Sequence, residues 1–202
     1  MKGIIDSAPD ISKIDVTPTG YSTTVLAANG EETATLVGQG ANRQYVTIDE
    51  IPLDLQHAFV AIEDERFYDH NGIDLHGIGR AFISGLSKGR FSEGASTITQ
   101  QLIKNNVLTS WTSETSFVEK LQRKIQEQYL ALELEKQVND KDWILENYMN
   151  SVNLGANTLG VQAASKKYFN KDVSELTLSE ASVIAGITQN PSGYNPITCL
   201  LY

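Results

Sequence analysis

The chain has 202 residues, of which 41% are hydrophobic and 20% charged, as expected of a globular domain with one hydrophobic core. Its 16 basic and 25 acidic residues give a formal net charge of −9, which argues against a general nucleic-acid-binding protein with a basic face. The one cysteine, Cys199, excludes an intrachain disulfide, and no apolar run approaches the ~20 residues of a membrane-spanning helix.

The N-terminal part of the sequence predicts an arm followed by a small hairpin. Residues 1–20 contain prolines among scattered polar residues and are typical of a linker or an extended arm. Two short β-prone runs follow at 21–28 and 31–37, joined by Asn29-Gly30. Asn-Gly between two such runs is a strong hairpin signal, because both positions tolerate a positive φ. Residues 38–54 lack a regular pattern and are expected to be irregular.

From residue 55 onward the hydrophobic pattern is helical. Thr97 and Thr177 are each followed three residues later by Gln or Glu, which is the sequence signature of a capping box at a helix start. The sequence therefore predicts a mainly α fold, with helices at 55–68, 97–107, 117–138, 141–152, 161–168 and 177–187.

Glu63 is a candidate general base. On the first predicted helix its i−4 and i+4 neighbours are Phe59 and Phe67, so its carboxylate would share an aromatic face. Desolvation on that face would raise the pKa of the carboxyl group toward the range useful for general-base catalysis. The alternative is a surface glutamate in the acidic run Glu63-Asp64-Glu65, and the local pattern alone favours this plainer interpretation.

Residues 94–101, Gly-Ala-Ser-Thr-Ile-Thr-Gln-Gln, form a turn of small residues that enters a helix rich in hydroxyl and amide groups. Backbone N–H groups at such a helix start suit an oxygen-rich, anionic ligand. Lys104 lies one turn beyond Gln100 and would add a positive charge. Simple capping by Ser96 and Thr97 is the alternative, but it does not account for the amides and the lysine that follow.

The predicted helix over 117–138 is apolar on two sides when residues are placed at about 100° each. One face carries Leu121, Ile125, Tyr129 and Leu132, and the roughly opposite face carries Leu130 and Leu134. Arg123 and Glu127 share the second face, with Lys124 beside them. A helix that is apolar on two sides is expected to be buried, which would place these charges in or beside a cleft. A solvated i,i+4 ion pair explains the same pattern equally well.

The histidines and the cysteine suggest no metal site and no nucleophile. His70 precedes Asn71-Gly72, where the chain must turn, so we expect it to form a turn-stabilising hydrogen bond. His57 and His76 have no partners at metal-ligand spacing, and Cys199 has no visible histidine partner.

Five segments resemble, in order, the motifs of family 51 glycosyltransferases, the peptidoglycan-polymerising domains of class A penicillin-binding proteins. They lie at 63–72, 94–101, 123–127, 141–150 and 160–171, within a resemblance that covers about residues 40–196. One such motif is weak evidence, but five in the family's order are strong evidence. The resemblance implies a lysozyme-like helical domain over 41–202, truncated at its C-terminal end, preceded by an arm and hairpin over 1–40.

The resemblance also implies a reaction. Glu63 would take the proton from the 4-hydroxyl of an acceptor sugar, and this hydroxyl would attack the anomeric carbon of the lipid-linked donor with inversion. Lipid II would be the substrate, a β-1,4 glycan strand the product and undecaprenyl pyrophosphate the leaving group. Glu127 is the second expected catalytic residue and the expected ligand of a divalent cation, Mg²⁺ or Mn²⁺. The implied substrate-binding residues are Asp64, Phe67, His70, Ser96, Thr97, Gln100, Gln101, Lys104, Arg123 and Lys124.

Members of this family work at the extracytoplasmic face of the bacterial plasma membrane, held by an N-terminal transmembrane helix that this sequence lacks. We therefore expect a fragment of a longer enzyme in which a transpeptidase domain follows, and no nucleic-acid partner. The stretch between the second and third motifs would touch the membrane surface or pack internally; its apolar residues are Val107, Leu108, Trp111 and Phe117.

Two other functions stay open at the level of sequence. A glycan-cleaving enzyme, either a muramidase or a lytic transglycosylase, also uses a glutamate on a lysozyme-like fold. Hydrolysis of a neutral sugar has no need for Lys104, Arg123 and Lys124, whereas a pyrophosphate leaving group does. A non-catalytic module that binds lipid II or glycan has no use for Glu63 together with Glu127.

Overall fold

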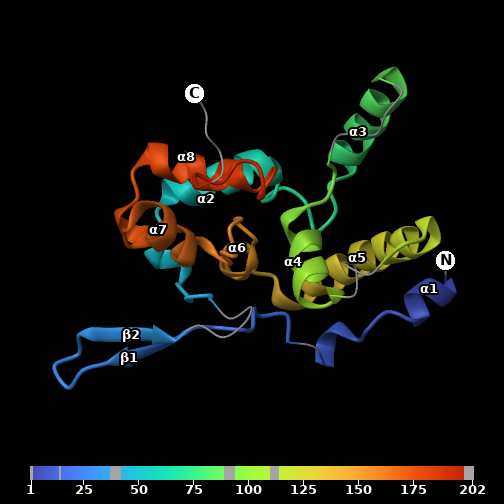
Figure 1. Ribbon diagram of the computed structural model, residues 1–202. Coiled ribbons are helices and arrows are strands. Elements are labelled where there is room, and N and C mark those ends of the chain that lie inside the picture. Colours follow the sequence, from blue (N-terminus) through green and yellow to red (C-terminus); the bar gives the residue numbers. More distant parts are fainter. Residues whose placement is uncertain (1, 14, 37–41, 89–93, 110–113, 198–202) are drawn as a thin grey trace. The chain divides into compact units, whose positions relative to one another are not determined.

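The computed structural model describes residues 2–13, 15–36, 42–88, 94–109 and 114–197. The chain divides into two compact units, Met1–Val16 with Glu63–Ile144 and Thr17–Ile62 with Leu145–Tyr202. Helices dominate the described residues, and one two-stranded hairpin forms in the N-terminal part of the sequence (Figure 1), so the predicted fold class is confirmed. No described helix is long and apolar enough to cross a bilayer. The domain boundary expected between residues 40 and 41 lies outside the described residues.

The first unit is built around the long helix α5 (Phe117–Val138), against which α4 (Ile98–Asn106) packs. Leu102 and Ile103 of α4 and Leu130 of α5 are fully buried, so apolar residues at helical spacing form this contact. The opposite face of α5 does not fit the two-sided burial predicted for this helix, because Leu121 is 50% and Leu132 43% exposed.

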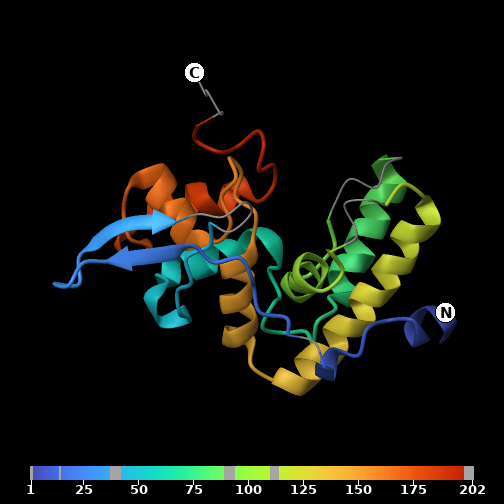
Figure 2. The same ribbon diagram turned by 60° about the horizontal axis from the view of Figure 1, so that its bottom comes forward.

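Residues 2–13 do not form the linker or extended arm that the sequence predicts over residues 1–20. They contain α1 (Lys2–Asp6) and the short 3-10 helix η1 (Ile11–Lys13), and both lie alongside α5 in the two views (Figures 1 and 2). The Gln126 side chain on α5 donates to the carbonyl of Ile4 at 3.2 Å, and Val16 is buried. Apolar residues scattered among the polar ones anchor this segment, and they carry no periodic signal.

Helix α3 (Leu75–Lys88) is absent from the predicted helices. Its glycines, among them Gly77 and Gly79, lower its intrinsic helix propensity and hide its start. Asp74, the residue before the helix, stabilises its first turn, because its carboxylate accepts a hydrogen bond from the backbone N–H of Gly77.

Helix α2 (Leu53–Glu63) ends at Glu63, so the prediction of a helix as far as residue 68 is wrong. Turns follow at once, with the N–H of Phe67 bonded to the carbonyl of Asp64 at 2.8 Å. Phe67 therefore does not lie one helical turn beyond Glu63, and the predicted aromatic face does not form. Phe59 packs edge-to-face on Tyr148 in the second unit, whereas Phe67 is buried in the first.

The hairpin of the second unit pairs β1 (Thr23–Leu26) with β2 (Glu32–Leu36) in antiparallel register, with an irregularity after Val25. Asn-Gly marks its turn, as predicted, but only Gly30 adopts a positive φ, of 85°. The Asn29 carboxamide instead accepts a hydrogen bond from the backbone N–H of Glu31 at 3.1 Å, which stabilises a longer loop. Most side chains of both strands are exposed.

The helices of the second unit match the predicted ranges within one or two residues. They are α6 (Lys141–Ser151), which begins in the first unit, α7 (Val161–Phe169) and α8 (Leu178–Ile187). The predicted capping box at Thr177 forms with Glu180. Short 3-10 helices η2 (Ile48–Glu50) and η4 (Val173–Glu175) complete the unit. Asn150 of α6 holds the segment before η2 by bonding both backbone groups of Val46, at 3.0 and 2.8 Å.

Gly72 is a position where a side chain would disturb the first unit. Its φ is +85°, and an added Cβ would lie 2.7 Å from the carbonyl oxygen of Ala131 in α5. We expect Gly72→Ala to destabilise the protein by roughly 2–4 kcal/mol, since positive φ and overpacking both cost energy. Gly79→Ala is the matched control, because its Cβ meets open space in α3, and it should stabilise by up to about 1 kcal/mol. Urea unfolding measures both; equal stabilities would contradict this account of the turn.

Candidate active site

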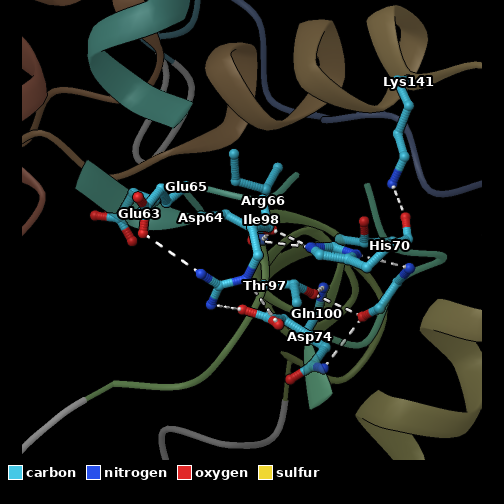
Figure 3. Close-up of polar contacts among 12 residues, drawn as sticks. Glu63, Asp64, Glu65, Arg66, His70, Asp74, Thr97, Ile98, Gln100 and Lys141 are labelled. Carbon is cyan, nitrogen blue, oxygen red and sulfur yellow. Dashed lines mark hydrogen bonds and ion pairs between the residues drawn. The ribbon is translucent and has the colours of Figure 1, made fainter. Parts of the chain in front are cut away.

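A buried carboxylate, that of Asp64, connects the end of α2 to the start of α4 (Figure 3). This carboxylate forms hydrogen bonds with Nε2 of His70, which lies 2.8 and 3.0 Å from the two oxygens. It also accepts a hydrogen bond from the backbone N–H of Ile98 at 3.0 Å. The N–H of Gly72 donates to Nδ1 of His70 at 3.2 Å, so Nδ1 must be the unprotonated ring nitrogen. His70 is therefore an Nε2–H donor to Asp64, and the predicted turn-stabilising role of this histidine is confirmed.

The carbonyl of Gly72 is the second fixed point of this region. The hydroxyl of Thr97 donates to it at 2.8 Å and the carboxamide of Gln100 at 3.2 Å. Thr97 also caps α4 by accepting from the N–H of Gln100, but the Gln100 side chain does not complete a capping box because it bonds to Gly72. Both side chains are almost fully buried, so their hydrogen-bonding groups already serve the protein itself. Their roles in binding substrate stay predictions.

Glu63 is the last residue of α2 and is partly buried. Its Oε2 accepts a hydrogen bond from the Gln101 carboxamide at 2.7 Å. The position of the Glu63 carboxylate is therefore set by Asp64, the next residue, and by Gln101 of α4, which is distant in sequence. Phe67 is buried beneath this region, with its ring 6.4 Å from that of His70.

A cluster of charges at α5 and the turn before α4 forms the other half of the site. Glu127 is fully buried, and its carboxylate pairs with the Arg123 guanidinium and, at 2.7 Å, with the Lys124 ammonium. Lys124 also donates to the Ser96 hydroxyl at 2.6 Å. Burial alone would lower the pKa of Arg123, but its hydrogen bond to Glu114 and the charge of Glu127 outweigh burial and raise that pKa.

Lys104 of α4 lies where the two halves meet. Burial lowers the pKa of its ammonium group, and the charges of Lys124 and Arg123 lower it further. The negative charges of Glu127 and Glu63 oppose this shift. A partly desolvated cation with two other cations nearby gains stabilisation when an anion arrives. The expected basic cluster of Lys104, Arg123 and Lys124 is thus assembled in space.

The divalent cation expected at Glu127 finds little support in the side chains around it. Each carboxylate oxygen of Glu127 already pairs with a cation, Arg123 on one and Lys124 on the other. In the described ranges, no three His, Cys, Asp or Glu side chains gather as a metal site requires. These residues do not fit a metal bound by the protein alone, and the predicted requirement for Mg²⁺ or Mn²⁺ remains a separate prediction.

Three residues that the sequence does not single out support this site. Lys141 donates to the carbonyl of His70 at 2.6 Å, pairs with Glu135 at 2.6 Å and lies 4.5 Å from the centre of the Phe67 ring. Glu135 also accepts from the hydroxyl of Thr99 on α4 at 2.5 Å. Glu114 binds Arg123 from the segment before α5. Lys141 opens the fourth motif-like segment, but the sequence does not indicate its contacts with His70, Glu135 and Phe67. Glu114 and Glu135 lie outside the five segments.

The Asp64 network gives a direct stability prediction. Asp64→Asn keeps the size of the side chain but replaces one acceptor oxygen with an NH2 donor. His70 or the N–H of Ile98 then loses its hydrogen-bond acceptor. We expect a loss of about 1–3 kcal/mol in the free energy of unfolding. Asp69→Asn is the control, since Asp69 is exposed, and it should stay within ~0.5 kcal/mol of wild type. An Asp64→Asn protein as stable as the control would show that the network is not essential for stability.

The chain resembles known proteins over most of its length. Residues 29–200 match the family described as Transglycosylase. Penicillin-binding protein 1A of Clostridium botulinum (strain Hall) is 50% identical over 161 residues, 77% of this chain and 18% of that protein. Penicillin-binding protein 1F of Bacillus subtilis is 44% identical over 176 residues, covering 87% and 23% of the two chains.

Penicillin-binding protein 1A/1B of Bacillus subtilis is 39% identical over 195 residues, 96% of this chain and 20% of that protein. The chain therefore spans about a fifth of the length of these relatives. The family match includes both halves of the site, from Glu63 to Glu127. With this match and this geometry together, the chain belongs to the transglycosylase family, as the glycosyltransferase domain of class A penicillin-binding proteins.

Proposed function

We propose that this domain polymerises lipid II into β-1,4 glycan strands with release of undecaprenyl pyrophosphate. The observation that carries the proposal is the pairing, within one compact unit, of an oriented carboxylate with a separate basic cluster. Glycosyl transfer from a pyrophosphate-linked donor needs a base at the acceptor hydroxyl and positive charge where the leaving group becomes anionic.

In this reaction Glu63 takes the proton from the 4-hydroxyl of the acceptor sugar. The freed oxygen lone pair attacks the anomeric carbon of the donor from the face opposite the pyrophosphate, so the configuration inverts. The glycosidic bond forms as the bond from that carbon to the pyrophosphate oxygen breaks, and the bonding electrons leave with the pyrophosphate. Gln101 keeps the carboxylate of Glu63 in position through its hydrogen bond of 2.7 Å.

The basic cluster neutralises the departing pyrophosphate. Lys104, Arg123 and Lys124 supply the positive charge, and Glu127 holds the two cations of α5 in fixed positions. Fixed charges aimed at a developing anion stabilise the transition state more than mobile solvent does, because they need no reorganisation. Ser96 contacts Lys124 and belongs to the same donor side.

We further propose that the domain works at the extracytoplasmic surface of the plasma membrane, with a transpeptidase domain elsewhere in the full-length protein. Support comes from the length of the relatives and from apolar exposure at the start of α5, where Phe117 is 79% and Val118 66% exposed. Large exposed apolar side chains at one helix end suit a membrane interface. Trp111, which the sequence places in the same stretch, lies outside the described residues.

The reaction is tested with Glu63→Gln on fluorescent lipid II in detergent, with products separated on a gel. We expect wild-type protein to make a ladder of strands and the variant to lose about 10²–10⁴-fold in rate, the usual contribution of a general base. Glu65→Gln is the matched control, since its carboxylate is two residues away and largely exposed, and it should retain activity. The same assay with and without EDTA tests the divalent-cation requirement.

Other outcomes discriminate between functions. Cleavage of preformed glycan by wild type, with no polymer from lipid II, would establish a glycan-cleaving enzyme instead. Equal binding of lipid II by wild type and Glu63→Gln, with no turnover by either, would indicate a binding module.

A further inference from the structure

Arg123 is held by a second carboxylate that the proposed reaction does not use. Its Nε–H donates to both carboxylate oxygens of Glu114, at 2.9 Å each, while its Nη1 pairs with Glu127. The Arg123 and Glu114 side chains are only 16% and 11% exposed. A guanidinium held this tightly between two carboxylates is not fully available to an incoming anion.

The two carboxylates differ in what they are fixed to. Glu127 lies inside α5 and is fully buried, so it moves with the helix. Glu114 lies before α5, two residues ahead of the N-cap Ser116. The helix start has its own hydrogen bonds, because Glu119 accepts from the N–H of Ser116 at 3.0 Å and the Ser116 hydroxyl accepts from the N–H of Glu119 at 3.1 Å. Glu114 can therefore leave Arg123 without uncapping the helix.

Electrostatics favour the release of Glu114 from Arg123 when an anion binds. Its carboxylate offsets positive charge in the cluster formed by Lys104, Arg123 and Lys124, where a pyrophosphate would need it. In the absence of an anion, the same carboxylate prevents the cost of a poorly solvated, partly unpaired arginine. A carboxylate and a phosphate oxygen are alternative partners for the same guanidinium edge, since both accept its parallel N–H groups.

We propose that Glu114 is an internal competitor for the anion site: it occupies the Nε edge of Arg123 in the free protein, and a pyrophosphate group displaces it. This inference rests on the proposed function only for the identity of the natural anion. The apparent affinity for pyrophosphate is then reduced by the fraction of molecules in which Glu114 holds Arg123.

The test measures binding of inorganic pyrophosphate to the full chain by isothermal titration calorimetry, in metal-free buffer. Glu114→Gln removes the charge but keeps the shape, and we expect its Kd for pyrophosphate to fall about three- to tenfold below wild type. Glu119→Gln is the matched control: it makes the same change in net charge five residues away and keeps a residue that suits a capping box. Its Kd should match wild type.

Two further variants separate contact from charge. Glu114→Asp keeps the charge but shortens the reach to Arg123, so its affinity for pyrophosphate should also rise, and it serves if Glu114→Gln does not fold. In an Arg123→Gln background, Glu114→Gln should no longer change the Kd. Circular dichroism and thermal unfolding confirm that each variant is folded.

Weaker or unchanged binding in both Glu114 variants would overturn the inference, as would an equal gain in Glu119→Gln or in the Arg123→Gln background. Absence of pyrophosphate binding by folded Glu114→Gln at millimolar concentration would overturn it too. Each of these results is independent of the polymerisation assay. A wild-type protein that makes glycan strands while these outcomes occur would keep its proposed function and lose only the competitor.

Discussion

The carboxylate of Asp64 is the constraint on which the site depends. It accepts from His70 and from the first N–H of α4, so it fixes the exit from α2, the following turn and the start of the helix that carries Gln101 and Lys104. A buried carboxylate is tolerated only when its hydrogen bonds are made, so these elements must assemble together. The hydrogen bonds of Asp64 therefore also position Glu63, the residue immediately before it.

A second constraint is the cost of burying charge beside α5. Glu127 is fully buried, and its ion pairs with Arg123 and Lys124 offset the cost of burying its carboxylate. The pairing holds the cations where a leaving pyrophosphate would gather charge, so structural stability and the proposed chemistry use the same contacts. The carboxylate that orients the cations also limits how much free positive charge they offer, and Glu114 adds to that limit.

Much of the architecture could be predicted from periodicity and capping signals. The long helix α5, the capping box of α8 and the Asn-Gly hairpin turn appear where the sequence places them. Local signals failed where a distant partner decides the backbone. Helix α2 stops at Glu63 because Asp64 bonds outside the helix, and α3 forms despite its glycines. The N-terminal residues expected as a linker or an extended arm pack against α5 instead.

The sequence by itself determined the helical class, the order of the five motifs and therefore the family, because residue types at fixed spacing carry that information. It also pointed to Glu63 and to the cations of α4 and α5. The tertiary structure alone decided which partners these groups have: Gln101 at Glu63, Gly72 for Thr97 and Gln100, and Glu114 on Arg123. Such pairings join residues 9–38 positions apart through hydrogen bonds in a packed interior, and no local pattern encodes which buried donor meets which acceptor.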